Sequence, residues 1–349
     1  MRPLSALLLA GLTAALAGCT SPSSGTSGTS GASGTGGPTA APKTGTIKLG
    51  MMPKQKGIPY FNACEVGARK AAQELGDVEL TYEGPTEDKS EAQSTMLDTW
   101  VTRRLDAVAV ACNDKDQIAP SLSQARDKDI AVVTWDADAD PEASKRQFFV
   151  NQVVADDIAV TLVDEMAKQV GKNAQVAVVS SSSTAPNQSV WLAAMEKYQK
   201  EKYPDMTVVT TEYAGENQVL SEQKAESILK AYPKVKGIWG MTSVAFPGAA
   251  GAVQRAGKQG QVAVVGLGTP NDMKPYVKSG VVKSVVLWNP VDLGYLTVCV
   301  ARAVAKGELK PGATTFKAGS LGEKEVRGQE ILLGKPMVFT KENIDQFDF

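Results

Sequence analysis

From Thr46 onward, strand-like and helix-like segments alternate along this chain, and this alternation strongly limits the folds open to it. Apolar and β-branched runs predict strands near 46–52, 78–83, 106–112 and 130–136. Amphipathic patterns between them predict helices near 60–76, 88–104 and 115–128. Strands that alternate with helices form a parallel sheet with helices on both faces. The first series therefore predicts an α/β domain with a doubly wound parallel sheet.

A second series of the same kind follows Asn151. Its predicted strands lie near 174–179, 206–213, 235–241 and 261–267, and its helices near 153–170, 187–203, 218–232 and 245–256. A strand near 281–288 and a helix near 291–306 come next, and the remainder to 349 is predicted to hold turns and short strands. At 349 residues the chain is longer than one compact core usually allows. Two successive doubly wound α/β domains are therefore expected, with a ligand site in the gap between them.

Polar residues follow directly after the predicted strand that starts at Ile130. Trp135, Asp136 and Asp138 come at its carboxyl end, the edge of an open α/β sheet where ligands bind. We therefore expect these three side chains to face a small hydrophilic molecule. A solvated loop is the alternative interpretation.

The composition argues against several classes of function. The 37 basic and 38 acidic residues nearly balance, and no basic patch with interleaved aromatic residues indicates nucleic-acid binding. The chain has 0 histidines, which removes the commonest general base and most zinc sites. The runs Ser180–Thr184 and Gly266–Gly268 lack the phosphate-loop and dinucleotide patterns and are predicted to be tight turns between strand and helix. We expect no cofactor and no metal.

The amino-terminal stretch has the pattern of an export signal. Arg2 precedes an apolar run from Leu4 to Leu16 that is too short to remain as a membrane span, so residues 1–18 are interpreted as a signal peptide. The sequence Leu16-Ala17-Gly18-Cys19 resembles the lipobox of bacterial lipoproteins, whose cysteine is lipidated. A generic export signal with an incidental cysteine is the alternative.

The segment 19–45 is then the lipidated cysteine with a flexible linker, since Thr20 to Gly45 is nearly all Ser, Thr, Gly, Ala and Pro. This interpretation predicts an exported lipoprotein anchored to the cell membrane on its extracytoplasmic side. Three further cysteines remain, Cys64, Cys112 and Cys299. A disulfide between Cys64 and Cys112 is compatible with the sequence but not required by it.

Several short stretches are distributed across the predicted folded part: 50–54 (GMMPK), 82–86 (YEGPT), 133–136 (VTWD), 150–152 (VNQ), 266–271 with 275–277, 287–288 (LW) and 341–344 (KENI). They resemble the sugar-type periplasmic binding proteins, and most closely their autoinducer-2-binding and rhamnose-binding branch. The resemblance implies the type I fold of that family, with two lobes joined by a hinge that the chain crosses three times. It places residues 46–150 plus 289–310 in an amino-terminal lobe and 151–288 plus 311–349 in a carboxyl-terminal lobe. Hinge closure would bury the ligand in the cleft.

In the first lobe, the resemblance assigns Lys54 to the family's ligand-contacting lysine and Asp136 to its acid. A carboxylate accepts hydrogen bonds from two neighbouring hydroxyls, and an ammonium donates to hydroxyl or ring oxygens. A surface lysine is the alternative for Lys54.

In the second lobe, the autoinducer-2-binding branch has an Asp-Gln pair where this chain has Asn187 and Gln188. Its Pro and Ala contacts correspond here to Met241 and Ser243. An amide both donates and accepts, whereas a carboxylate only accepts. These departures favour a small neutral sugar or sugar alcohol over autoinducer-2.

Aromatic side chains at strand ends complete the predicted site. Tyr60, Phe61 and Trp288 could cover the apolar face of a carbohydrate, and Asn289 could add a polar contact. Burial in the protein core is the alternative for the aromatic residues.

These features predict a solute-binding lipoprotein of an ABC importer, a monomer that carries a small sugar or polyol to a membrane permease and catalyses no reaction. An autoinducer-2-binding protein is one alternative, and a sensory protein that docks to a membrane receptor is another. A glycosidase with Asp136 and Asp138 as its acid pair is disfavoured, because positions two apart seldom hold carboxyl groups at the required separation. The export signal argues against a transcriptional repressor of the same fold.

Overall fold

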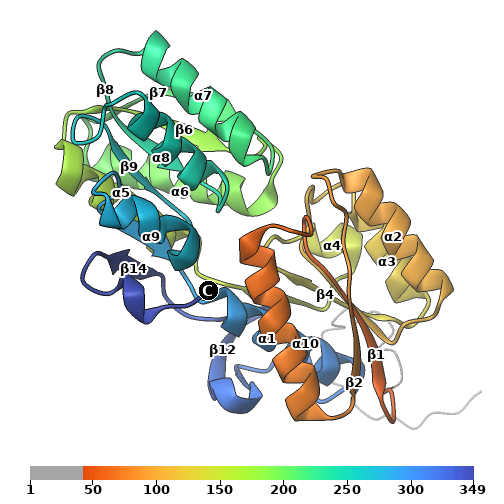
Figure 1. The fold of residues 1–349 in the computed structure, drawn as a ribbon. Coiled ribbons are helices and arrows are strands. Elements are labelled where there is room, and N and C mark those ends of the chain that lie inside the picture. The colour runs from red at the N-terminus through yellow and green to blue at the C-terminus, as the bar shows by residue number, and fades with distance from the viewer. Residues whose placement is uncertain (1–41) are drawn as a thin grey trace, which may run out of the picture. The chain divides into compact units, whose positions relative to one another are not determined.

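The structure, a computed structural model, describes residues 42–349, and the alternation of strands and helices runs through nearly all of them. The predicted signal peptide, Cys19 and nearly all of the predicted linker lie outside the described residues. The two predicted series form two separate parallel sheets (Figure 1). The prediction of two doubly wound α/β lobes is therefore confirmed.

The first sheet has eight strands in the order β11-β12-β13-β5-β4-β3-β1-β2. From the first series come β1 (Ile47–Met52), β2 (Val78–Tyr82), β3 (Ala107–Val110), β4 (Ala131–Trp135) and β5 (Phe148–Asn151). From the end of the chain come β11 (Thr315–Lys317), β12 (Glu323–Arg327) and β13 (Glu330–Leu332). The strands β1 to β5 pair with one another in parallel, and β13 also pairs in parallel with β5. The β11–β12 and β12–β13 pairs are antiparallel. The sequence had not predicted β5.

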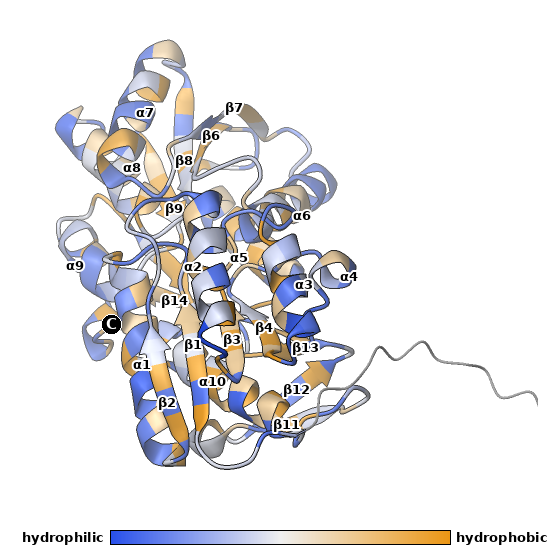
Figure 2. Ribbon diagram, turned by 90° about the vertical axis from the view of Figure 1, so that its right-hand side faces the viewer, coloured by the Kyte–Doolittle hydropathy of each residue, from blue (hydrophilic) through white to orange (hydrophobic). Residues whose placement is uncertain are grey.

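Both faces of this sheet are covered, because its central strands are apolar on both sides. Leu49 and Met51 of β1 belong to one core, under α1 (Pro59–Leu75) and α10 (Pro290–Ala305). Met52 belongs to the other, under α2 (Ser90–Thr102) and α3 (Ala119–Asp127). In Figure 2 the strands β1 and β3 are accordingly coloured as hydrophobic. The short helix α4 (Pro141–Ser144) follows β4.

Two glycines allow α1 and α10 to pack at very close range. A Cβ atom on Gly67 would lie 1.7 Å from the carbonyl oxygen of Val291, and one on Gly294 would lie 1.9 Å from that of Cys64. Backbone atoms block both positions, so any larger residue would force the helices apart. This contact fixes the first turns of α1 against the beginning of α10 (Figure 1).

The second sheet has four parallel strands in the order β7-β6-β8-β9. They are β6 (Gln175–Ser180), β7 (Thr207–Tyr213), β8 (Val235–Gly240) and β9 (Ala263–Gly266). The helices of this lobe are α5 (Ala155–Val170), α6 (Pro186–Lys202), α7 (Gln218–Ala231), α8 (Ala245–Arg255) and α9 (Pro270–Lys278). Beyond β9, β10 (Ser284–Leu287) pairs antiparallel with β14 (Met337–Thr340), and a bridge from Leu267 to Val286 joins β10 to the end of β9.

The chain passes between the two sheets three times, after β5, after β10 and after β13. The third passage, after β13, comes later in the chain than the lobe boundary expected between residues 310 and 311. Strands β11 to β13 extend the first sheet through the pairing of β13 with β5, whereas residues 311–349 had all been expected in the second lobe. These strands are short and carry many charges, so their sequence does not indicate which sheet they join. The remaining lobe boundaries stay predictions.

The three cysteines of the described residues, Cys64, Cys112 and Cys299, are all buried and free. The disulfide that the sequence left open between Cys64 and Cys112 is not formed. Among residues 42–349, no helix combines the length and the apolar character needed to cross a membrane.

Candidate functional site

The carboxyl ends of strands from both sheets surround one cavity. From the first lobe, Lys54 follows β1, Asp136 follows β4, and Tyr60 and Phe61 lie in the first turn of α1. The second lobe and the β10 segment contribute Asn187, Gln188, Trp191, Glu216, Met241, Thr242, Ser243, Leu267, Leu287 and Trp288. Parallel strands place the polar residues that follow them at one edge, which explains why segments far apart in sequence meet here.

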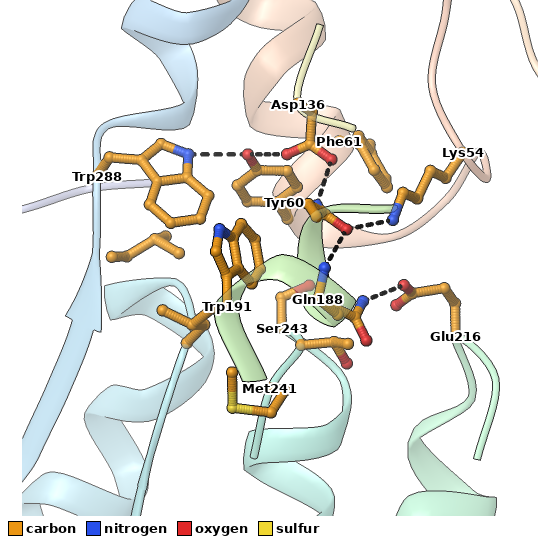
Figure 3. A pocket seen from close by; sticks show the side chains of 14 residues that line it. Lys54, Tyr60, Phe61, Asp136, Gln188, Trp191, Glu216, Met241, Ser243 and Trp288 are labelled. Carbon is orange, nitrogen blue, oxygen red and sulfur yellow. Dashed lines mark hydrogen bonds between the residues drawn. The ribbon is translucent and has the colours of Figure 1, made fainter. Parts of the chain in front are cut away.

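Asp136 lies at the end of a relay of hydrogen bonds that begins at Trp288. The Trp288 Nε1–H donates to the Tyr60 hydroxyl over 2.8 Å, and this hydroxyl donates to Asp136 Oδ1 over 2.8 Å (Figure 3). Asp136 has a left-handed φ of 60°, a conformation that Asp tolerates better than most residues. The turn directs its carboxylate away from the strand and toward the cavity.

Asn187 connects the two lobes at the centre of the site. The Lys54 ammonium donates to Asn187 Oδ1 over 2.9 Å, and Asn187 Nδ2 donates to Asp136 Oδ2 over 3.3 Å (Figure 3). The backbone N–H of Gln188 donates to the same Asn187 oxygen over 2.9 Å. One amide of the second lobe thus satisfies both charged groups of the first lobe, which a carboxylate at this position could not do.

A second network holds the Gln188 side chain. Its Oε1 accepts from the Ser180 hydroxyl over 2.5 Å and from the Ser181 backbone N–H over 2.9 Å, while its Nε2 points to Glu216 Oε1 at 3.4 Å. Ser180 and Ser181, at the start of the turn between β6 and α6, therefore hold the Gln188 side chain in place.

The backbone of Lys54 is positioned by residues of the first lobe. Asn113 Nδ2 donates to the Lys54 carbonyl oxygen over 3.2 Å, and Gln93 Nε2 donates to the Pro53 carbonyl oxygen over 3.2 Å. Gln93 in turn accepts from the backbone N–H of Asn113 over 2.9 Å. Lys54 is only 3% exposed, so its ammonium is directed into the cavity rather than to the surface.

Burial shifts the pKa values of the acids in the site. Burial raises the pKa of Asp136, while the neighbouring Lys54 and the Tyr60 hydrogen bond act in the opposite direction. Burial also raises the pKa of Glu216, to about 7, with Asp88 and Asp136 adding to the effect and Lys54 opposing it. Carboxyl groups with raised pKa values in a cavity are typical of functional sites.

The free space between these side chains is about 40 Å³. This volume holds a few water molecules but not a monosaccharide. A larger ligand must therefore displace the hydrogen bonds of Asn187 or enter when the lobes are apart.

Nine of the eleven residues predicted for ligand binding line the cavity. They are Lys54, Tyr60, Phe61, Asp136, Asn187, Gln188, Met241, Ser243 and Trp288. Trp191, Glu216, Thr242, Leu267 and Leu287 also line it and had not been predicted. Trp191 lies three and four residues after Gln188 and Asn187, on the same face of α6, and Glu216 follows the end of β7. Helical spacing from Gln188, and the strand-end rule that identified Asp136, could have found these two.

Asp138, Asn289 and Trp135 have different partners and do not line the cavity. The Asp138 carboxylate pairs with Arg146, whose Nη2 lies at 2.6 Å and Nε at 2.8 Å. Asn289 caps α10 by accepting from the Val291 backbone N–H over 2.9 Å, a role that the following Pro290 indicates. Trp135 is fully buried and donates to the Met52 carbonyl oxygen over 3.2 Å, so it belongs to the core.

Among residues 42–349, no group of three or more His, Cys, Asp or Glu side chains is arranged to hold a metal ion.

A family model described as "Periplasmic binding protein domain" matches residues 49–309, about three quarters of the chain. The chain belongs to this family. This periplasmic binding protein is 26% identical over 225 residues to the D-apiose import binding protein of Actinobacillus succinogenes. The aligned region covers 64% of this chain and 69% of the relative.

Two solved structures are also similar to it. LsrB from Clostridium saccharobutylicum, in complex with AI-2, is 26% identical with a TM-score of 0.82 and covers 87% of this chain and 100% of that chain. An ABC transporter solute-binding protein from Clostridium phytofermentas with bound L-rhamnose is 28% identical with a TM-score of 0.82. The match covers 86% of this chain and 98% of that chain. The periplasmic binding protein thus has the type I fold and the extracytoplasmic location of its family, and its relatives are sugar-binding transport proteins rather than enzymes.

Proposed function

We propose that this periplasmic binding protein is the solute-binding lipoprotein of an ABC importer. It binds a small neutral sugar or sugar alcohol in the cavity between its lobes and delivers it to a membrane permease. The membrane anchor is a lipid on Cys19, in the segment outside the described residues.

The observation that carries this proposal is the contact of Asn187 with both Lys54 and Asp136. An acceptor, a donor and an amide from two lobes converge at one point, beside the indole rings of Trp191 and Trp288, whose centroids lie 5.8 Å apart. A sugar presents hydroxyl groups at its rim and C–H groups on its faces, which match polar groups and aromatic rings respectively. Each hydrogen bond to a charged group contributes about 1.5 to 3 kcal/mol.

In this mechanism the ligand takes over the contacts that Asn187 makes with Lys54 and Asp136. Vicinal hydroxyls bind the Asp136 carboxylate, a ring or hydroxyl oxygen accepts from Lys54, and Asn187 and Gln188 bind from the second lobe. Closure of the hinge then buries the ligand, and the closed form engages the permease.

AI-2 is the second candidate ligand, because the structure of LsrB in complex with AI-2 is among the similar proteins. The amide of Asn187 favours the neutral sugar or polyol. It already accepts from Lys54 and donates to Asp136, and it can do the same with two hydroxyl groups of a ligand.

Thermal-shift measurements on the purified chain test the proposal. Pentoses, deoxyhexoses, tetritols, pentitols and AI-2 are compared, each at a concentration a hundred times the dissociation constant expected for it. A bound ligand at that ratio stabilises the folded state by about 2.7 kcal/mol and visibly raises the melting temperature. The proposal requires a sugar or polyol to give the largest shift. A response to AI-2 alone would establish the second candidate, and no response to any of these compounds would refute both.

A further inference from the structure

Glu216 is the acid of the cavity to which the function described above gives no role. It follows β7 in the second lobe and lies at the end of the cavity opposite Trp288 (Figure 3). Its only side-chain hydrogen bond among the described residues is the long one, 3.4 Å, from Gln188 Nε2 to Oε1. The second carboxyl oxygen therefore remains available to a ligand.

The charges around Glu216 do not neutralise it. In the described part of the chain, Lys54 is the only cation that lowers the pKa of the Glu216 carboxyl group, and the Lys54 ammonium already donates to Asn187. Asp88 and Asp136 both act against ionisation of Glu216. Asp88, from the loop before α2, approaches the same turn, since a Cβ atom on Gly215 would lie 4.0 Å from its Oδ2. Within residues 42–349, none of these three carboxyl groups forms an ion pair.

We propose that Glu216 is a specificity-determining residue of this site and binds the ligand as a neutral carboxylic acid that donates a hydrogen bond to a ligand oxygen. The inference rests on the proposed binding of a neutral sugar or polyol. It assigns one acid to each lobe with opposite roles. Asp136 accepts from ligand hydroxyls, and Glu216 donates.

The direction of the pKa shift agrees with this assignment. Burial, Asp88 and Asp136 raise the Glu216 pKa to about 7 in the closed arrangement. An open cleft returns the carboxyl group to water and to its ordinary value of 4.5. The closed form therefore takes up a proton between these values, so ligand binding is strongest below about pH 4.5, weakens as the pH rises to about 7 and levels off above it.

The test is isothermal titration calorimetry on the full chain at pH 6.0, 7.0 and 8.5. The probes are L-rhamnose, D-ribose and D-allose, which have no titrating group in this range, and the amino sugar D-glucosamine. For the wild type we expect a dissociation constant about tenfold weaker at pH 8.5 than at pH 6.0, and uptake of about half a proton per ligand at pH 7.0. Measurement in two buffers of different ionisation enthalpy gives the proton count.

Four variants separate Glu216 from its neighbours. Glu216→Gln keeps a donor that cannot titrate, so its dissociation constant should be flat across the three pH values. Glu216→Ala should bind about two- to tenfold more weakly at pH 6.0, as expected for one neutral hydrogen bond. Asp88→Asn should move the pH transition to lower pH without removing it. Glu212→Gln, which removes a β7 carboxylate that pairs with Lys224 outside the cavity, should keep the wild-type profile.

A neutral sugar that binds with the same affinity at all three pH values would overturn the inference and leave the proposed function intact. A Glu216→Gln variant with the wild-type pH profile would also overturn the inference. The same holds if D-glucosamine binds more tightly than the neutral sugars and Glu216→Gln abolishes its binding, because Glu216 would then act as an anion. Absence of a response to every sugar and polyol, both these probes and those of the thermal-shift panel, would overturn the proposed function, and this inference with it.

Discussion

Asp136 and Asp138 are two residues apart and have entirely different surroundings. The turn at Asp136 directs its carboxylate into the cavity, where it accepts from Tyr60 and Asn187. Asp138 is held by Arg146, a side chain that is 9% exposed. Substitution at the two positions should therefore affect different properties of the protein.

Asp136→Ala is expected to weaken sugar binding. Loss of a charged hydrogen bond to the ligand removes about 1.5 to 3 kcal/mol, which is about ten- to 150-fold in the dissociation constant. Calorimetric titration with the best ligand of the thermal-shift panel measures the effect. An unchanged affinity in the folded variant would remove Asp136 from the site.

Asp138→Asn is the matched control and should lower stability instead. It leaves the buried Arg146 guanidinium without its carboxylate partner, which costs up to about 3 kcal/mol of unfolding free energy given that Asp138 is partly exposed. Urea denaturation measures this loss. The affinity of the folded fraction should stay within about twofold of the wild type, and a loss similar to that of Asp136→Ala would show that Asp138 also contacts the ligand.

At the scale of elements, the close contact of α1 with α10 supports the first-lobe half of the site. Tyr60 and Phe61 lie in the first turn of α1, and Gly294 lies in the second turn of α10 against Cys64. Separation of these helices would also shift the Tyr60 hydroxyl, which links Trp288 to Asp136.

Gly294→Ala should destabilise the protein by about 1 to 3 kcal/mol, because a methyl group cannot fit 1.9 Å from a backbone carbonyl oxygen. Gly334→Ala is the control, since a Cβ atom there meets nothing within 4 Å. Thermal unfolding of the two variants and the wild type gives the comparison. Equal melting temperatures for both variants would contradict the packing described here.

The sequence predicted most elements and the residues that follow directly after buried strands. Asp136 was found in this way, because an apolar strand that stops at a charge marks a sheet edge, whereas Lys54 was assigned through the resemblance to the sugar-type binding proteins. Glu216 and Trp191 were missed, the first after a strand that has no fully buried residue and the second one turn inside a helix. Asp138 and Asn289 were placed in the site because their actual partners, Arg146 and the α10 backbone, are not evident without the fold.

At the scale of the whole molecule, the three passages between the sheets explain how a binding site can open and close. One lobe contributes Lys54 and Asp136 and the other contributes Asn187, so no single lobe holds the complete site. The third passage could not be predicted, since short charged strands such as β12 fit either sheet by their pattern.

Membrane attachment through Cys19 is the prediction that concerns the chain as a whole. Cells that express the full chain should incorporate labelled palmitate into it, and Cys19→Ser should abolish the label. A Cys64→Ser variant is the control, because that thiol is buried within α1 and should not affect labelling. Persistent labelling of Cys19→Ser would contradict the lipobox interpretation.

The small free volume of the cavity also bears on the time a solute stays bound. About 40 Å³ of free space lies between the lobes around Lys54, Asn187 and Asp136, so a sugar enters or leaves this cavity when the lobes separate. Its residence time is then limited by how often the two lobes separate. Substitutions in the connecting segments should change the dissociation rate even where they contact no ligand atom. The permease, by holding the lobes apart, would set the moment of release.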